Sequence, residues 1–150
     1  MTWIEIETST YQDHVIKHVL GATILGWLIA EDAVHFVLDV GLLWTVYING
    51  EMNLMALSGA IQDLESDELP QSVIDEVSAD AQDLITNGRE ATGLKHLKAA
   101  TVDCLITEVQ LMGYGAELRT VIRGEISTIA VEASIGEKLI RVSEVNELSA

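Results

Sequence analysis

The sequence is short of cysteine, proline and basic residues, and each shortage narrows what the protein can be. One cysteine, Cys104, cannot form an internal disulfide, so nothing points to an oxidising compartment. One proline, Pro70, and 11 glycines in 150 residues leave no linker-like segment. Because 49% of the residues are hydrophobic, the chain can bury a core, and we expect a single domain over residues 1–150.

Long hydrophobic runs are also missing. The most apolar uncharged stretch, residues 19–30, holds 12 residues, whereas a membrane-spanning helix needs about 20. The first ten residues lack the basic region and the apolar run of a signal peptide. We therefore expect a soluble, cytoplasmic protein.

Positive charge is scarce and unevenly placed. The net charge is −16; residues 1–88 hold 15 acids and one base, a net charge of −14, while residues 89–150 hold nine acids and seven bases. Such a field repels nucleic-acid phosphates and anionic lipids, so we expect neither nucleic-acid nor membrane binding. The charge either steers a basic partner toward the chain or serves only to keep an apolar protein in solution.

Recognisable catalytic motifs are absent as well. The sequence contains no Gly-x-Ser-x-Gly elbow and no phosphate-binding loop, and the glycines at 113 and 115 lack the third glycine of a dinucleotide fingerprint. We predict no cofactor, and a protein without enzymatic activity is better supported than an enzyme.

What the chain does contain is a β-meander. Residues 18–57 show four runs with the period-two spacing of strands, joined by tight turns, and a short helix capped by Ser9 or Thr10 precedes them. Asn49-Gly50 predicts a type I′ hairpin turn. The meander is apolar on both faces, so both need cover. Helices can supply one face, and a second meander or a second copy of the chain the other, which slightly favours a homodimer.

Two predicted helices follow the meander, at residues 58–64 and 70–86. The longer one has apolar residues at helical spacing and ends at Asn87-Gly88. A second meander is then predicted, with strands at 100–111, 117–123, 126–133 and 138–142, a turn at 113–115 and a polar tail after residue 142. The strand at 117–123 alternates charged and apolar residues and is predicted to lie at the surface or edge. The fold class is therefore α+β, mainly antiparallel, in one wide sheet or two packed sheets.

The second meander carries a faint echo of the first. Residues 18–24 align with residues 96–102 at an offset of 78 and share His, Ala and Thr, and the match extends with two shifts to Gly50 and Gly136. The echo predicts pseudo-repeats at 9–57 and 89–143, joined by the helical segment 58–88. Shared β-strand composition can also produce it by chance, so duplication is one of two interpretations.

Three groups of side chains are candidate sites. The first is an acidic face for a basic partner on the central helices, with a plain solvated helix face as the alternative; its residues are Asp63, Glu65, Asp67, Glu68, Asp75, Glu76, Asp80 and Asp83. The second is an aromatic pocket, with a simple core role as the alternative; its residues are Trp27, His35, Trp44 and Tyr47. The third is a weak metal candidate, because His14 and His18 share a helix face but have no assignable third ligand.

The function that these features favour is binding. The leading hypothesis is a small acidic inhibitor or immunity-type protein that captures a basic protein through its acidic helix. The alternatives are an enzyme or small-molecule carrier built on the aromatic pocket, and a structural subunit that only oligomerises.

Overall fold

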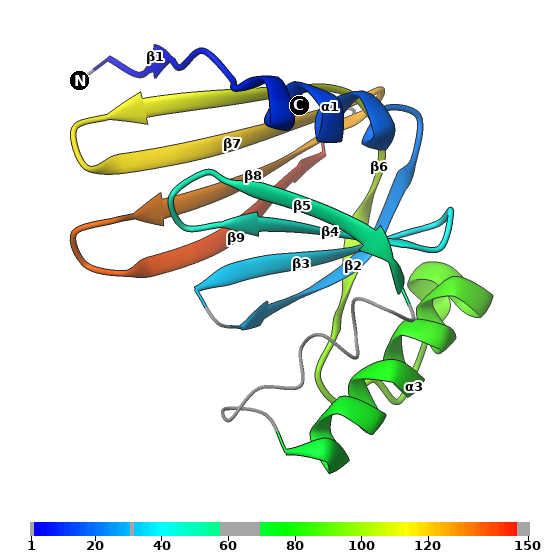
Figure 1. Cartoon of the computed structure of the whole chain (residues 1–150). Coiled ribbons are helices and arrows are strands. Elements are labelled where there is room, and N and C mark those ends of the chain that lie inside the picture. The colour runs from blue at the N-terminus through cyan, green and yellow to red at the C-terminus, as the bar shows by residue number, and fades with distance from the viewer. Residues whose placement is uncertain (1, 31, 58–69, 147–150) are drawn as a thin grey trace.

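The computed structural model of the protein describes residues 2–30, 32–57 and 70–146 (Figure 1). Its elements, in chain order, are β1 (Ile4–Glu5), α1 (Thr10–Val19), β2 (Thr23–Ala30), β3 (Ala33–Leu38), β4 (Leu42–Tyr47), β5 (Met52–Ala56), α3 (Gln71–Asn87), a 3-10 turn η1 (Gly88–Glu90), β6 (Lys98–Tyr114), β7 (Glu117–Gly124), β8 (Ser127–Ser134) and β9 (Leu139–Asn146). The fold is α+β and mainly antiparallel, which confirms the predicted class. The predicted helix at 58–64 lies outside the described residues.

The described strands form one antiparallel sheet. Its order is β5-β4-β3-β2-β6-β7-β8-β9, and β1 pairs with the far end of β6. Each meander is thus a run of neighbouring strands, and the two runs meet where β2 pairs with β6. β6 is long because it serves both halves: its first part pairs with β2, and residues 106–114 pair with β7.

The sheet is bent at this junction. The pairing register shifts between Ile24 and Gly26 in β2 and between Ile106 and Glu108 in β6, and such irregularities increase local twist. The two meanders therefore turn toward each other and enclose a common core, in which Trp44 of the first meander and Ile129 of the second belong to one buried cluster.

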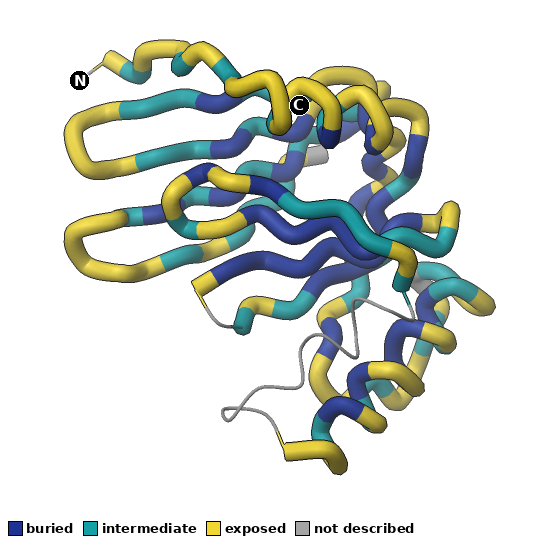
Figure 2. Tube along the Cα trace, viewed as in Figure 1, coloured by how far each residue is buried: buried dark blue, intermediate teal, exposed yellow. Residues whose placement is uncertain are grey.

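Both faces of the first meander are covered within the chain. All six residues of β3 are buried. The second meander covers the inner face, and α3 covers the outer face with a stripe of Ile74, Val77, Ala81 and Leu84 (Figure 2). The apolar pattern that favoured a second copy is therefore satisfied inside one chain.

Local signals set the start of α1 and the end of α3. The Ser9 side chain accepts the backbone N–H of Gln12, and the Gln12 side chain accepts the backbone N–H of Ser9, which is a complete capping box. Val15 and Val19 then pack into the core. Gly88 ends α3 with a φ of 59°, as predicted for a glycine after a helix.

Three local predictions are wrong. The Asn49-Gly50 hairpin exists, but among the described residues only Asp32 and Lys138 are non-glycines with positive φ, so Asn49 does not adopt the type I′ conformation. Of the two residues, only Gly50 has a positive φ, of 87°. The Gly50 N–H donates to the Tyr47 carbonyl, as in a turn followed by a glycine bulge.

β7, predicted to lie at the surface or edge, is a surface strand: it lies between β6 and β8, and its charged residues Glu117, Arg119 and Arg123 are exposed or half-buried. The other two corrections also concern the second meander. β6 runs through residues 113–114, so the turn falls at Gly115, and β9 continues to residue 146 where a polar tail was predicted.

The segments of the internal echo occupy equivalent places in the two meanders. Residues 18–24 lead into β2 and residues 96–102 into β6, which are the first strand of each run. Gly50 and Gly136 both lie in the turn before the last strand of their run. Duplication of one unit stays a prediction.

Candidate functional site

The predicted acidic face maps only partly onto the described structure. Asp63, Glu65, Asp67 and Glu68 lie outside the described residues. The other four acids, Asp75, Glu76, Asp80 and Asp83, are on α3, and they differ in environment.

Asp80 lies on the buried side of α3 and is only 4% exposed. Its carboxylate accepts backbone N–H groups from Lys95 at 3.0 Å, His96 at 2.6 Å and Leu97 at 2.9 Å. Burial raises the pKa of Asp80, but these three donors outweigh burial and hold the pKa below its ordinary value. Asp80 therefore anchors the segment that enters β6 and cannot face a partner.

Glu76 is half-buried and already paired. Its Oε2 lies 3.0 Å from Lys95 Nζ and its Oε1 lies 3.4 Å from His96 Nε2. Hydrogen bonds from Lys95 and His96 lower the pKa of Glu76, so the side chain is ionised at neutral pH. The Lys95 side chain is 65% exposed, so the ion pair is open to solvent. Another cation can therefore take the place of Lys95 beside Glu76.

Asp75 and Asp83 remain available on the outer surface of α3. Asp75 is exposed and accepts a hydrogen bond from Gln71, and Asp83 accepts one from Asn87. A shallow hollow of about 320 Å³ separates them from the 93–95 segment. The described part of the acidic face is thus smaller than the sequence predicts, but it is concave and carries Asp75, Glu76 and Asp83.

The predicted aromatic pocket does not form as one site. Trp27 and Trp44 flank Phe36 in a row across three strands, with ring centroids 6.2 and 5.5 Å apart, and all three are buried in the core. His35 and Tyr47 belong to the opposite face of the sheet, because they alternate with Phe36 and Trp44 along β3 and β4. His35 is buried and its Nδ1 lies 2.9 Å from Thr45 Oγ1.

The two helix histidines contact each other. The ring centroids of His14 and His18 are 4.5 Å apart, and His18 Nδ1 is hydrogen-bonded to the His14 carbonyl oxygen at 2.8 Å. Within the described ranges, no group of three or more His, Cys, Asp or Glu side chains is placed to hold a metal ion. Cys104 is fully buried in the core.

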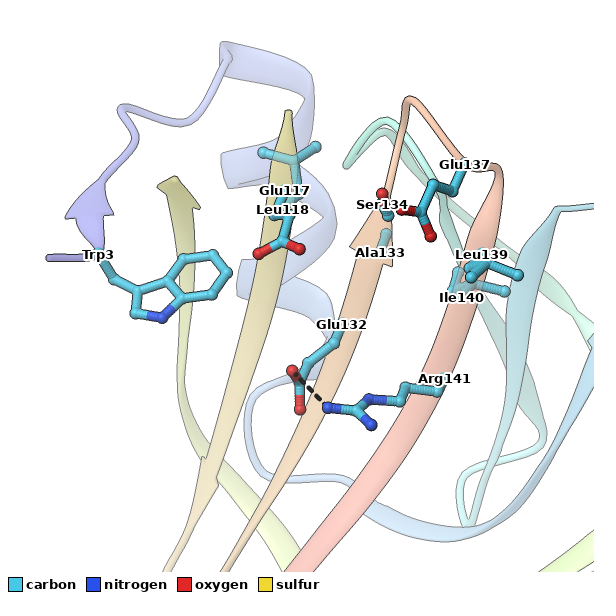
Figure 3. Close-up of a pocket in the computed structure, with 10 residues that line it drawn as sticks. All are labelled: Trp3, Glu117, Leu118, Glu132, Ala133, Ser134, Glu137, Leu139, Ile140 and Arg141. Atoms are coloured by element: carbon cyan, nitrogen blue, oxygen red, sulfur yellow. Dashed lines mark hydrogen bonds and ion pairs between the residues drawn. The ribbon is translucent and has the colours of Figure 1, made fainter. Parts of the chain in front are cut away.

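A hollow that the sequence did not predict lies on the outer face of the second meander (Figure 3). We call it the Trp3 pocket. It has a volume of about 360 Å³ and is lined by Trp3 together with residues at the ends of β7, β8 and β9. The strand register places two rows of opposed residues here, Glu117–Ser134–Leu139 and Arg119–Glu132–Arg141, and all of them except Arg119 line the pocket.

Trp3 reaches this pocket because β1 pairs with the far end of β6. The Arg119 guanidinium lies 4.2 Å from the centre of the Trp3 ring, a cation–π contact. No local signal in the sequence joins residue 3 to residue 119, since the contact depends on a strand pairing across more than a hundred residues.

Charges in the Trp3 pocket are partly balanced. Glu132 Oε2 lies 3.1 Å from Arg141 Nη2 and 3.3 Å from Arg119 Nη2. Burial raises the pKa of Glu132, but the two guanidinium groups outweigh burial and keep the pKa below its ordinary value. Among the described residues, the carboxylates of Glu117 and Glu137 have no hydrogen-bond or ion-pair partner.

Comparison of the chain with protein-family models, with curated proteins and with solved structures found no match. In the described part of the chain, no helix has the length and apolar character needed to cross a membrane.

Proposed function

We propose that the protein is a non-enzymatic binding protein that captures a basic protein through the outer surface of α3. The observation that carries this proposal is the charge: −16 in 150 residues, with 15 acids against one base in residues 1–88. A field of this size accelerates the approach of a cationic partner and gives it a preferred direction. The single buried cysteine suits a cytoplasmic setting.

The shape of α3 supports the choice of surface. Asp75 is exposed and Asp83 half-exposed beside a hollow that can accept a side chain. Glu76 is held there by Lys95 of the same chain, and a lysine or arginine of a partner can replace Lys95 in that solvent-open pair. The buried Asp80 keeps the segment carrying Lys95 fixed against α3.

The test measures affinity for a lysine-rich peptide of about ten residues by calorimetry, from about 0.02 to 0.5 M NaCl. We expect the affinity to fall steeply with salt. Replacing Asp75 and Asp83 by asparagine should weaken binding by about fivefold or more, because each lost pair contributes up to about 1 kcal/mol.

The matched control is the double variant Glu51→Gln and Glu125→Gln, which removes the same charge from exposed positions away from α3. Equal weakening in both double variants would show that only the overall field matters and would contradict a site on α3. Binding that ignores salt would contradict capture by charge.

A further inference from the structure

The described sheet ends in two edge strands, β5 and β9, which differ in cover. α1 lies beside β5 (Figure 1): the Tyr11 hydroxyl donates to the Asn53 side chain at 3.2 Å, and the Gln12 side chain donates to the Gly50 carbonyl at 2.8 Å. β9 pairs with β8 on one side, and no described strand pairs with its other side. The backbone N–H and C=O groups on that side are therefore open to a further strand.

β9 also leaves apolar side chains in water. Leu139 is 61% exposed and Val145 is 56% exposed, near the two ends of the strand. They share the outer face of the sheet, because they alternate with Ile140 and Val142, which pack against the core. Ile140 and Val142 are themselves only half-buried, since the described sheet ends here. A strand added at this edge would therefore bury apolar area on both faces.

β9 is complementary to a second copy of itself. In an antiparallel pair with a twofold axis at Val142, Leu139 of each copy lies opposite Val145 of the other. Arg141 then lies opposite Ser143, whereas an axis at Arg141 would set the two arginines against each other. The axis at Val142 thus joins the two exposed apolar side chains twice and places no like charges directly opposite each other.

The charge distribution favours this surface for self-association. Two chains of net charge −16 repel each other, so they associate most readily where acids are few. Residues 138–146 hold two bases and one acid, whereas residues 1–88 hold one base and 15 acids. The local excess of positive charge disfavours a basic partner at β9 and fits an acidic one, such as another copy of this chain.

We propose that two copies of the protein associate through β9, in an antiparallel pair centred on Val142 that continues the sheet from one chain into the other. The interface is a single strand pair, so the dimer is weak and reversible. This surface is separate from the one that the first meander was predicted to offer, which α3 and the second meander cover. The dimer goes beyond the capture of a basic protein by α3, and neither proposal depends on the other.

Sedimentation equilibrium measures the association, over protein concentrations from about 5 µM to 1 mM. We expect a monomer–dimer equilibrium with a dissociation constant below about 100 µM. The dimer should become tighter as NaCl rises from about 0.02 to 0.5 M, because salt screens the repulsion between two acidic chains. Capture of a basic peptide by α3 should weaken over the same range, so the two proposals predict opposite effects of salt.

Two double variants test the pairing of the strands. Leu139→Lys with Val145→Lys sets lysine against lysine at both ends of the strand pair and should weaken the dimer by about tenfold or more. Leu139→Lys with Val145→Glu sets opposite charges in the same two places and should dimerise at least about tenfold more tightly than the double-lysine variant. General repulsion between the chains predicts the reverse order, because only the double-lysine variant lowers the net negative charge.

The matched control is Ile4→Lys with Val40→Lys, which places two lysines at exposed apolar positions on β1 and in the β3–β4 turn. This control should dimerise at least as tightly as wild type, and circular dichroism checks that all three variants fold. Three results would overturn the proposal: a monomer at about 1 mM protein, equal association of the two β9 double variants, and a loss in the control equal to that of the double-lysine variant of β9.

Discussion

The Asp80 carboxylate accepts the backbone N–H of Leu97 at 2.9 Å, and this bond joins the middle of α3 to the start of β6. Asp80 also accepts the N–H groups of Lys95 and His96. One buried side chain thus satisfies three consecutive donors in a segment that has left the helix but not yet joined the sheet. The acid that looked like part of a binding face is a structural anchor.

Replacing Asp80 by asparagine should destabilise the protein by about 2 to 4 kcal/mol, because the variant loses the charge and places an amide N–H₂ against backbone donors that remain buried. Urea unfolding followed by circular dichroism measures the change. Asp75→Asn is the matched control, since Asp75 is exposed, and its effect should stay within about 0.5 kcal/mol. Equal effects of the two substitutions would show that the Asp80 bonds contribute nothing beyond surface charge.

The contribution of Asp80 should depend on pH. The pKa of Asp80 in the folded protein is lower than its ordinary value of 3.8, so its stabilisation is fully present above that value and is lost as pH falls through the folded pKa. A protonated aspartate resembles asparagine, so the stability gap between wild type and Asp80→Asn should be constant from about pH 7 to 5 and should narrow as the pH falls below 3.8. Urea midpoints at these pH values measure the gap; a gap that persists at the lowest pH would assign the effect to shape rather than to charge.

Local features of the fold were predictable because they depend on neighbours in the sequence. The capping residue Ser9 and the helix-ending Gly88 are set by the chemistry of a few adjacent residues. The alternation in the strands was likewise sufficient to place both meanders. Turn type was less predictable, since Asn49-Gly50 fits both a two-residue type I′ loop, in which both residues have positive φ, and a turn followed by a glycine bulge, in which only Gly50 has positive φ.

The sites depended on long-range contacts, and the sequence carries little of that information. Asp80 is a partial exception: it lies three residues after Val77 and four before Leu84, on the apolar face of its own helix, and an acid there is buried only when backbone donors satisfy it. Nothing comparable marks Trp3, whose neighbours come from β6 and β7. Likewise, the cover of the first meander by the second follows from the bend where β2 meets β6.

Removing the capping hydroxyl by Ser9→Ala should cost about 0.5 to 2 kcal/mol, because the Gln12 N–H loses its acceptor at the start of α1. Ser78→Ala is the control, and it is not expected to lower stability. Ser78 is exposed in the middle of α3, where alanine has the higher helix propensity, so that variant should be neutral or slightly more stable. Thermal unfolding of both variants against wild type tests the pair, and a loss of stability in Ser78→Ala matching that of Ser9→Ala would contradict a specific role for the cap.

The junction between the two meanders should be the least tolerant point of the sheet. A Cβ at Gly26 would collide with the Lys98 carbonyl oxygen and lie 2.8 Å from Leu84 Cδ1, so β2 could not keep its distance from β6. We expect Gly26→Ala to destabilise the protein by about 2 to 4 kcal/mol, or to prevent folding, because the overlap is with backbone that cannot rotate away. Gly136→Ala is the control: in the described structure no atom beyond its two chain neighbours lies within 4 Å of its Cβ position, and its φ is not positive. Urea unfolding should place Gly136→Ala within about 0.5 kcal/mol of wild type, and a Gly26→Ala variant equally close to wild type would show that the meanders do not meet as described.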